Sequence, residues 1–194
     1  MRKPLSIPPP ADYLTFSPSE LFRFFFQIGR WTEDSFSADF QNYTRGLAVF
    51  ATAPIPKGSR ITVFTGETYQ SETALGVPEI MRNHVIQVGK TEFIFGHKGL
   101  AHCVCHSCDP NCGIRNLVEI YAVKNISEGE QITWDYRCSE NSNWVLDNCL
   151  CGNERCTGFV GNYDSLPSHF KSEYKAKGMV SEWIVQSEPM TKHS

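Results

Sequence analysis

The sequence lacks long apolar runs. None of its hydrophobic stretches approaches the roughly 18 residues that a membrane-spanning helix needs. The opening MRKPLSIPPPADY also lacks the apolar stretch that follows the basic end of a signal peptide. Neither membrane insertion nor export is predicted, and we expect an intracellular protein, in the cytoplasm or the nucleus.

Positive charge is also scarce. The 194 residues include 18 Lys and Arg against 21 Asp and Glu, which gives a formal net charge of −3. Proteins that bind nucleic acids through the phosphates present a basic surface, so direct binding to nucleic acid is not expected. At 194 residues the chain is long enough for one domain, or for one domain with a small appendage, and its 41% hydrophobic and 12% aromatic residues are ordinary for a globular protein.

Cysteine is absent from the first 102 residues. All eight cysteines lie between Cys103 and Cys156. Disulfides are rare in reducing compartments, so a cluster of thiols in a protein without an export signal favours metal coordination.

Short strands dominate the sequence after Gly46. Runs rich in β-branched and aromatic residues alternate with Gly, Pro, Asn and Asp, and they read LAVFAT, SRITVFTG, NHVIQVG, EFIFG, VEIYAVKN and EQITWDY. This pattern predicts a mostly β domain. Helices are expected only near the termini, because SPSE at 17–20 has the form of a helix start and the segment from His169 onward contains one weakly helical stretch.

Three cysteines downstream have the spacing of metal ligands. Cys149, Cys151 and Cys156 form C-x-C-x4-C, and Gly152 allows the chain to turn sharply between them. A closed structural zinc site needs four ligands, so a fourth thiolate must come from elsewhere. The stretch CVCHSCDPNC at 103–112 is the expected donor, since a turn at Asp109–Pro110 would present its third cysteine. The alternative is a set of separately buried thiols. The predicted zinc ligands are Cys108, Cys149, Cys151 and Cys156.

The order of the motifs then indicates a family. HSCDPN at 106–111, GEQITWDY at 129–136 and the C-x-C-x4-C at 149–156 resemble the SET-domain protein-lysine methyltransferases, including the cysteine-rich post-SET segment of many members. RGLAVFA at 45–51 and TGE at 65–67 resemble the first cofactor loop of that family and the end of the strand after it. The resemblance covers roughly residues 44–166. It implies an N-terminal flank at 1–43, a SET domain at 44–140, a post-SET zinc segment at 141–166 and a C-terminal tail at 167–194.

The resemblance also implies a fold and an activity. The fold is of the β-clip type, with several small curved β-sheets around a pseudoknot in which the GEQITWDY strand passes beneath the HSCDPN loop. The implied activity is methyl transfer from S-adenosylmethionine to the lysine ε-amine of a protein substrate, a histone or another protein. Cofactor and lysine would enter from opposite faces and meet in a narrow channel.

Roles for single residues follow only from this resemblance. Tyr136 holds the position of the catalytic tyrosine, although a tyrosine at a strand end can also simply pack into the core. The expected channel walls are Phe93, Phe95 and Trp134, of which the two phenylalanines have the same structural alternative. The expected cofactor contacts are Arg45, Gly46, Leu47, Ala48, Cys105, His106, Tyr136 and Leu150.

Three residues depart from the family pattern. Cys105 stands where the family usually has asparagine, Ala48 stands at a glycine position, and Trp134 replaces a phenylalanine or tyrosine. A thiol donates and accepts hydrogen bonds weakly, so a polar contact is lost at Cys105. These changes leave two alternatives open, namely a SET-fold enzyme that acts on a small molecule and a non-catalytic interaction module.

Overall fold

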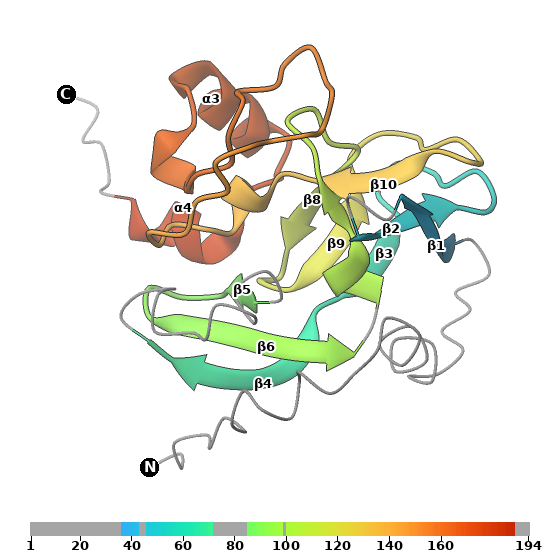
Figure 1. The fold of residues 1–194 in the computed structure, drawn as a ribbon. Helices are drawn as coiled ribbons and strands as arrows, with labels where there is room; N and C mark the ends of the chain where they lie inside the picture. The colour runs from blue at the N-terminus through green and yellow to red at the C-terminus, as the bar shows by residue number, and fades with distance from the viewer. Residues whose placement is uncertain (1–35, 43–45, 72–84, 99, 189–194) are drawn as a thin grey trace.

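The computed structural model describes residues 36–42, 46–71, 85–98 and 100–188. The helix start predicted at 17–20 lies outside these residues. The fold is mostly β, as predicted, and the α-helices in the described residues lie near the C-terminal end (Figure 1).

The strands are β1 (Phe36–Asn42), β2 (Gly46–Ala51), β3 (Arg60–Val63), β4 (Thr65–Gln70), β5 (Val85–Gln87), β6 (Glu92–Lys98), β7 (Cys105–His106), β8 (Cys112–Arg115), β9 (Glu119–Ala122) and β10 (Gln131–Trp134). The helices are the 3₁₀ turns η3 (Leu100–Cys103), η4 (Tyr136–Cys138) and η5 (Tyr163–Ser165) and the α-helices α3 (Ser168–Ala176) and α4 (Glu182–Ser187).

The strands form two sheets. The larger has seven strands in the order β1-β2-β10-β8-β9-β3, with β7 paired to β10, and the smaller has the order β4-β6-β5 (Figure 1). Most neighbours are antiparallel. β10 is the exception, because it is antiparallel to β2 but parallel to both β7 and β8.

These parallel pairings produce the predicted pseudoknot. Thr133 and Trp134 of β10 pair with Cys105 and His106 of β7, and Trp134 also pairs with Cys112 of β8. Residues 107–111 join β7 to β8, so this loop crosses the end of β10. The HSCDPN loop and the end of the GEQITWDY strand are thereby brought together.

Two turns lead into strands of the larger sheet. Gly58 precedes β3 and Gly129 precedes β10, with φ of +88° and +78°. A Cβ at either position would meet no atom within 4 Å, so the requirement for glycine is the backbone angle and not a lack of space.

The C-terminal helices are part of the core. Phe170 and Tyr174 of α3, Ile184 of α4 and the intervening Met179 are all buried in the same cluster as the sheet residues. The approach is close, since a Cβ at Gly113 of β8 would lie 2.9 Å from Met179 Cα. The sequence indicates one weakly helical stretch here, and the structure has two helices. Neither they nor any other helix within the described ranges is long and apolar enough to cross a membrane.

Candidate functional site

Tyr136 is the first residue of η4, two residues after the end of β10, at the point where the HSCDPN loop crosses that strand. Its hydroxyl donates to Val104 O at 3.0 Å, and its backbone N–H donates to His106 Nδ1 at 3.3 Å. Burial raises the pKa of the Tyr136 phenol well above its ordinary value, so the phenol is neutral at physiological pH. A neutral hydroxyl anchored to Val104 O is therefore the polar group at this position.

Aromatic rings surround Tyr136. The rings of His106 and Trp134 both lie 5.3 Å from it, and Trp144 of the 141–166 segment lies 6.4 Å away, centroid to centroid. Trp134 is only 4% exposed and also packs on Phe64. Its indole Nε1 meets no hydrogen-bond acceptor among the described residues. The site is therefore largely apolar.

His106 connects Tyr136 with the cysteine cluster. Because Nδ1 accepts from the Tyr136 amide, the ring proton belongs on Nε2, which lies 3.3 Å from Cys108 Sγ. Burial lowers the pKa of His106 to about 4, an effect that the nearby Asp135 carboxylate opposes only in part. The imidazole is thus neutral and donates toward sulfur.

Asp135 and Arg137, the residues on either side of Tyr136, form a buried ion pair. Arg137 is 1% exposed, and its Nε and Nη2 donate to Asp135 Oδ1 and Oδ2 at 2.9 and 2.7 Å. Its remaining Nη1 donates to Thr157 Oγ1 at 2.9 Å, in the 141–166 segment. Sequence reasoning missed this pair, since a charged residue after the DY dipeptide carries no burial signal of its own.

Asn111 fastens the crossing loop to β10. Its Nδ2 donates to Gln131 O at 2.8 Å and to Glu130 Oε1 at 2.9 Å, and its Oδ1 accepts from the Thr133 N–H at 2.9 Å. The side chain is 3% exposed. Asn111 belongs to the HSCDPN motif but was not among the predicted site residues, and its place in that motif is the signal that could have found it.

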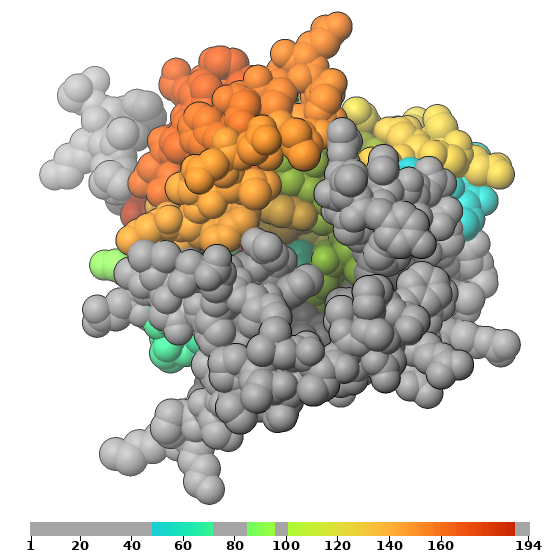
Figure 2. Space-filling model, viewed as in Figure 1, coloured from blue at the N-terminus to red at the C-terminus, as the bar shows by residue number. Residues whose placement is uncertain are grey.

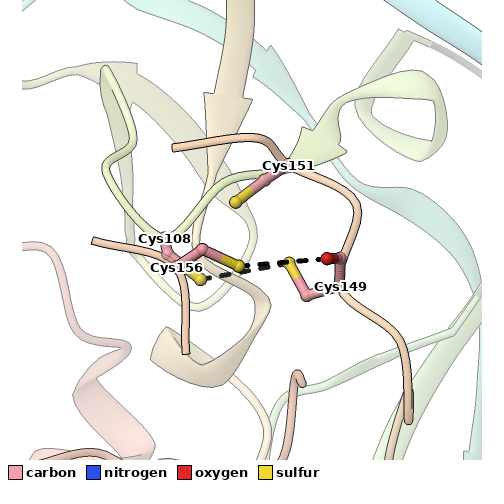
Figure 3. Close-up of side chains that lie close together, drawn as sticks. All are labelled: Cys108, Cys149, Cys151 and Cys156. Carbon is pink, nitrogen blue, oxygen red and sulfur yellow. Dashed lines mark hydrogen bonds between the residues drawn. The ribbon is translucent and has the colours of Figure 1, made fainter. Parts of the chain in front are cut away.

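Four cysteines converge beside this centre (Figure 3). Cys108 comes from the crossing loop, and Cys149, Cys151 and Cys156 come from the downstream segment, where Gly152 turns the chain at φ +70°. Their Sγ atoms all lie within 4.8 Å of one another, and those of Cys108 and Cys149 are 4.0 Å apart. A tetrahedral zinc ion with bonds of about 2.3 Å needs sulfurs about 3.8 Å apart, so the quartet fits after a small contraction.

The surroundings of Cys108, Cys149 and Cys151 shift the pKa values of these three thiols in different directions. Desolvation raises the pKa of Cys108 and of Cys149. Desolvation acts in the same sense on Cys151, but hydrogen bonds from the backbone of Cys108 and Asn153 outweigh it and lower its pKa to about 7. Of these three thiols, Cys151 therefore ionises most readily.

Comparison with known proteins identifies the family. The model of the SET domain matches residues 46–137, from the start of β2 to Arg137 in η4. Residues 46–137 of this chain are therefore a SET domain. The match contains the crossing loop, β10 and Tyr136, while the three downstream cysteines and the C-terminal helices lie beyond it.

Relatives of this SET domain include histone-lysine methyltransferases. The chain is 26% identical over 136 residues to histone-lysine N-methyltransferase ATX2 of Arabidopsis thaliana, a match that covers 62% of this chain and 12% of the relative. It is 29% identical over 142 residues to an H3 lysine-36 specific histone-lysine N-methyltransferase of Yarrowia lipolytica, with 66% and 18% covered. The chain thus spans less than a fifth of the length of these curated relatives.

A solved structure supports the SET fold independently. Arabidopsis thaliana SUVH6, crystallised in complex with S-adenosylmethionine, superposes with a TM-score of 0.53 at 19% identity. The superposition covers 64% of this chain and 33% of that one.

The SET fold distributes the predicted cofactor residues over two strands and a loop. Arg45 lies outside the described residues, Gly46 and Leu47 open β2, and Ala48 follows in the same strand, half-buried. Cys105 pairs with Thr133 in β7 and is also half-buried. Leu150, between two of the clustered cysteines, is 53% exposed.

The predicted channel residues lie in different sheets. Trp134 ends β10 of the larger sheet and is in ring contact with Tyr136. Phe93 and Phe95 lie on β6 of the smaller sheet. Phe93 is fully buried and stacks on Tyr69 at 5.5 Å, whereas Phe95 is half-buried.

Proposed function

We propose that this SET domain transfers a methyl group from S-adenosylmethionine to the lysine ε-amine of a protein, with Tyr136 as the catalytic residue. The observation that carries the proposal is the Tyr136 hydroxyl, anchored 3.0 Å from Val104 O where the HSCDPN loop crosses β10. The names of the two relatives described above, both histone-lysine N-methyltransferases, support the same reaction.

The cofactor would supply a methyl group activated on a sulfonium. The task of the chain is then to present a neutral amine in line with that methyl group. The ordinary pKa of a lysine is about 10.4, so its amine is protonated at physiological pH. An apolar environment lowers this pKa by disfavouring the charged form. The rings of Trp134 and Trp144 beside Tyr136 provide such an environment.

Tyr136 would contribute alignment. Its hydroxyl proton is committed to Val104 O, so its oxygen can only accept toward the reacting centre. A fixed acceptor of this kind orients an amine and a polarised methyl group without taking a proton, and positioning is the main demand of an in-line displacement.

The proposed cofactor site takes main-chain contacts from Arg45, Gly46, Leu47 and Ala48 at the start of β2, and side-chain contacts from Cys105, His106 and Leu150. Support comes from the sheet, because β2 and β7 both pair with β10 and so lie close to Tyr136. Trp134, Phe93 and Phe95 are the proposed walls of the lysine channel.

We propose in addition that Cys108, Cys149, Cys151 and Cys156 hold one structural zinc ion, which would fasten the post-SET segment to the crossing loop. The separations of the four sulfurs support this ligand set. The division into a flank at 1–43, a SET domain at 44–140, a post-SET segment at 141–166 and a tail at 167–194 belongs to the same proposal.

A histone is the proposed substrate class, and with it a nuclear location inside the cell. The specificity of the Yarrowia lipolytica relative for lysine 36 of H3 supports this choice. We do not expect direct binding to nucleic acid, because the net charge of −3 gives no attraction to phosphates.

The test is a methylation assay with zinc-loaded protein and S-adenosylmethionine. Core histones, a cell extract and a set of small amines are offered separately, and the products are read by mass spectrometry. We expect methylated lysine in a protein. Tyr136→Phe should lower the rate at least about 100-fold while the affinity for the cofactor is kept. Methylation of small amines alone, or no binding of the cofactor to zinc-loaded protein, would contradict the proposal.

A further inference from the structure

Tyr174 of α3 reaches the centre of the site from outside the segment that the SET model matches. Its side chain is 1% exposed, and its hydroxyl lies 3.1 Å from Cys108 O and 3.3 Å from Asp135 Oδ2. Cys108 is one of the clustered cysteines, and Asp135 directly precedes Tyr136. The hydroxyl of Tyr174 thus contacts both the loop that carries Cys108 and the residue that precedes Tyr136.

Asp135 sets the direction of the chain at Tyr136. Its Oδ1 caps η4 by accepting from the Arg137 N–H at 3.1 Å. The Arg137 guanidinium holds both carboxylate oxygens from one side, and the Tyr174 hydroxyl contacts Oδ2. A buried carboxylate keeps its orientation only while its hydrogen bonds are made, so loss of the Tyr174 hydroxyl would loosen this side chain.

α3 is itself held against the cysteine-rich segment. Arg155, next to Cys156, donates to Glu173 of α3 at 2.6 Å and to Asp109 of the crossing loop at 3.2 Å. Its guanidinium also lies 4.5 Å from the centre of the Phe170 ring. The position of α3 is therefore fixed relative to both cysteine-bearing segments. Figure 2 shows the downstream segment (orange) beside the C-terminal helices on one face of the molecule.

We propose that Tyr174 is a positioning residue for the methyl transfer. By holding the Asp135 carboxylate and the Cys108 carbonyl, it fixes the position of the Tyr136 hydroxyl relative to the crossing loop. It acts through Asp135 and does not touch the reacting atoms. The inference rests on the proposed function, and it makes α3 part of the catalytic unit.

The test compares two tyrosine variants of the full, zinc-loaded chain. Tyr174→Phe removes the hydroxyl and keeps the buried ring, so the fold is retained. The matched control is Tyr121→Phe, because the Tyr121 hydroxyl bonds to the carbonyls of Lys177 and Gly178 after α3 and makes no contact with Asp135. For Tyr174→Phe we expect kcat to fall about tenfold, with both KM values within about twofold, whereas Tyr121→Phe keeps kcat.

Native-state hydrogen exchange provides a readout that does not depend on turnover. The amides of Tyr136 and Arg137 should exchange faster in Tyr174→Phe than in Tyr121→Phe, measured at the same distance below the melting temperature of each variant. Unchanged exchange at these two amides overturns the inference, as do equal kcat values for the two variants. An inactive wild type would count against the proposed function, and the exchange comparison would still decide the role of Tyr174.

Discussion

Asn111 shows how one side chain can maintain the crossing of two chain segments. Both of its amide hydrogens bond to residues 130 and 131, and its carbonyl oxygen accepts from the Thr133 N–H and, at 3.5 Å, from Cys112 Sγ. No other residue type of similar size offers two donors and an acceptor in this geometry.

Asn111→Asp should destabilise the fold by about 3 kcal/mol, because it loses both donors and places a buried carboxylate against two oxygens. The free energy of unfolding, measured with denaturant, checks this value. Asn125→Asp is the matched control, since Asn125 is exposed and its Oδ1 accepts from the Lys57 N–H, a bond that an aspartate oxygen can also make. That variant should stay within about 0.5 kcal/mol of the wild type. Equal losses in the two variants would show that Asn111 does not fasten β10.

At the scale of elements, the 141–166 segment has little regular structure and depends on its contacts. The pairing of Leu146 with Val160 and the bond from Cys149 N to Gly158 O are its main backbone links. A bound zinc ion would join this segment to the crossing loop through Cys108.

Cys151→Ser should therefore lower the zinc content well below about one equivalent and raise hydrogen exchange across residues 141–160, while β8 and β9 stay protected. Metal analysis and exchange mass spectrometry measure the two effects. Cys103→Ala serves as the control, because Cys103 is buried outside the quartet and its replacement should leave the zinc content unchanged. Full zinc content in Cys151→Ser would exclude the four-cysteine site.

Part of the fold and part of the candidate site could be predicted from the sequence. Short runs of β-branched residues predict the strands, and the spacing C-x-C-x4-C with a glycine predicts three members of the quartet, because ligand chemistry restricts such spacings strongly. Tyr174 could not be found in this way. It follows Cys108 by 66 residues and Asp135 by 39, and a tyrosine in a weakly amphipathic helix gives no sign of the partners that its hydroxyl will meet.

On the scale of the whole molecule, the C-terminal helices close the core. The Glu182 carboxylate accepts from the backbone N–H groups of Asn116 and Leu117, two non-glycine residues at positive φ in the β8–β9 turn. The Trp183 indole, at 3.1 Å from Gln87 O and 3.2 Å from Ser139 O, connects the smaller sheet with the end of η4.

Deletion of residues 167–194 should abolish cooperative unfolding. It removes Phe170, Tyr174, Met179 and Ile184, whose burial contributes about 6–12 kcal/mol, comparable with the whole stability of a typical domain. Thermal unfolding followed by circular dichroism shows whether a cooperative transition remains. Deletion of 189–194, beyond the described residues, is the control and should leave the transition in place. A cooperative transition in the longer deletion would show that α3 and α4 are dispensable for folding.

The pairing of β2 with β10 has a consequence for synthesis. Gln131 follows its partner Phe50 by about 80 residues, so at about 5–20 residues per second β2 leaves the ribosome roughly 4–16 s before the strand it must pair with. During that interval one edge of β2 is open to any other strand nearby. The yield of native protein should therefore rise with slower initiation or with chaperones that shield nascent strands.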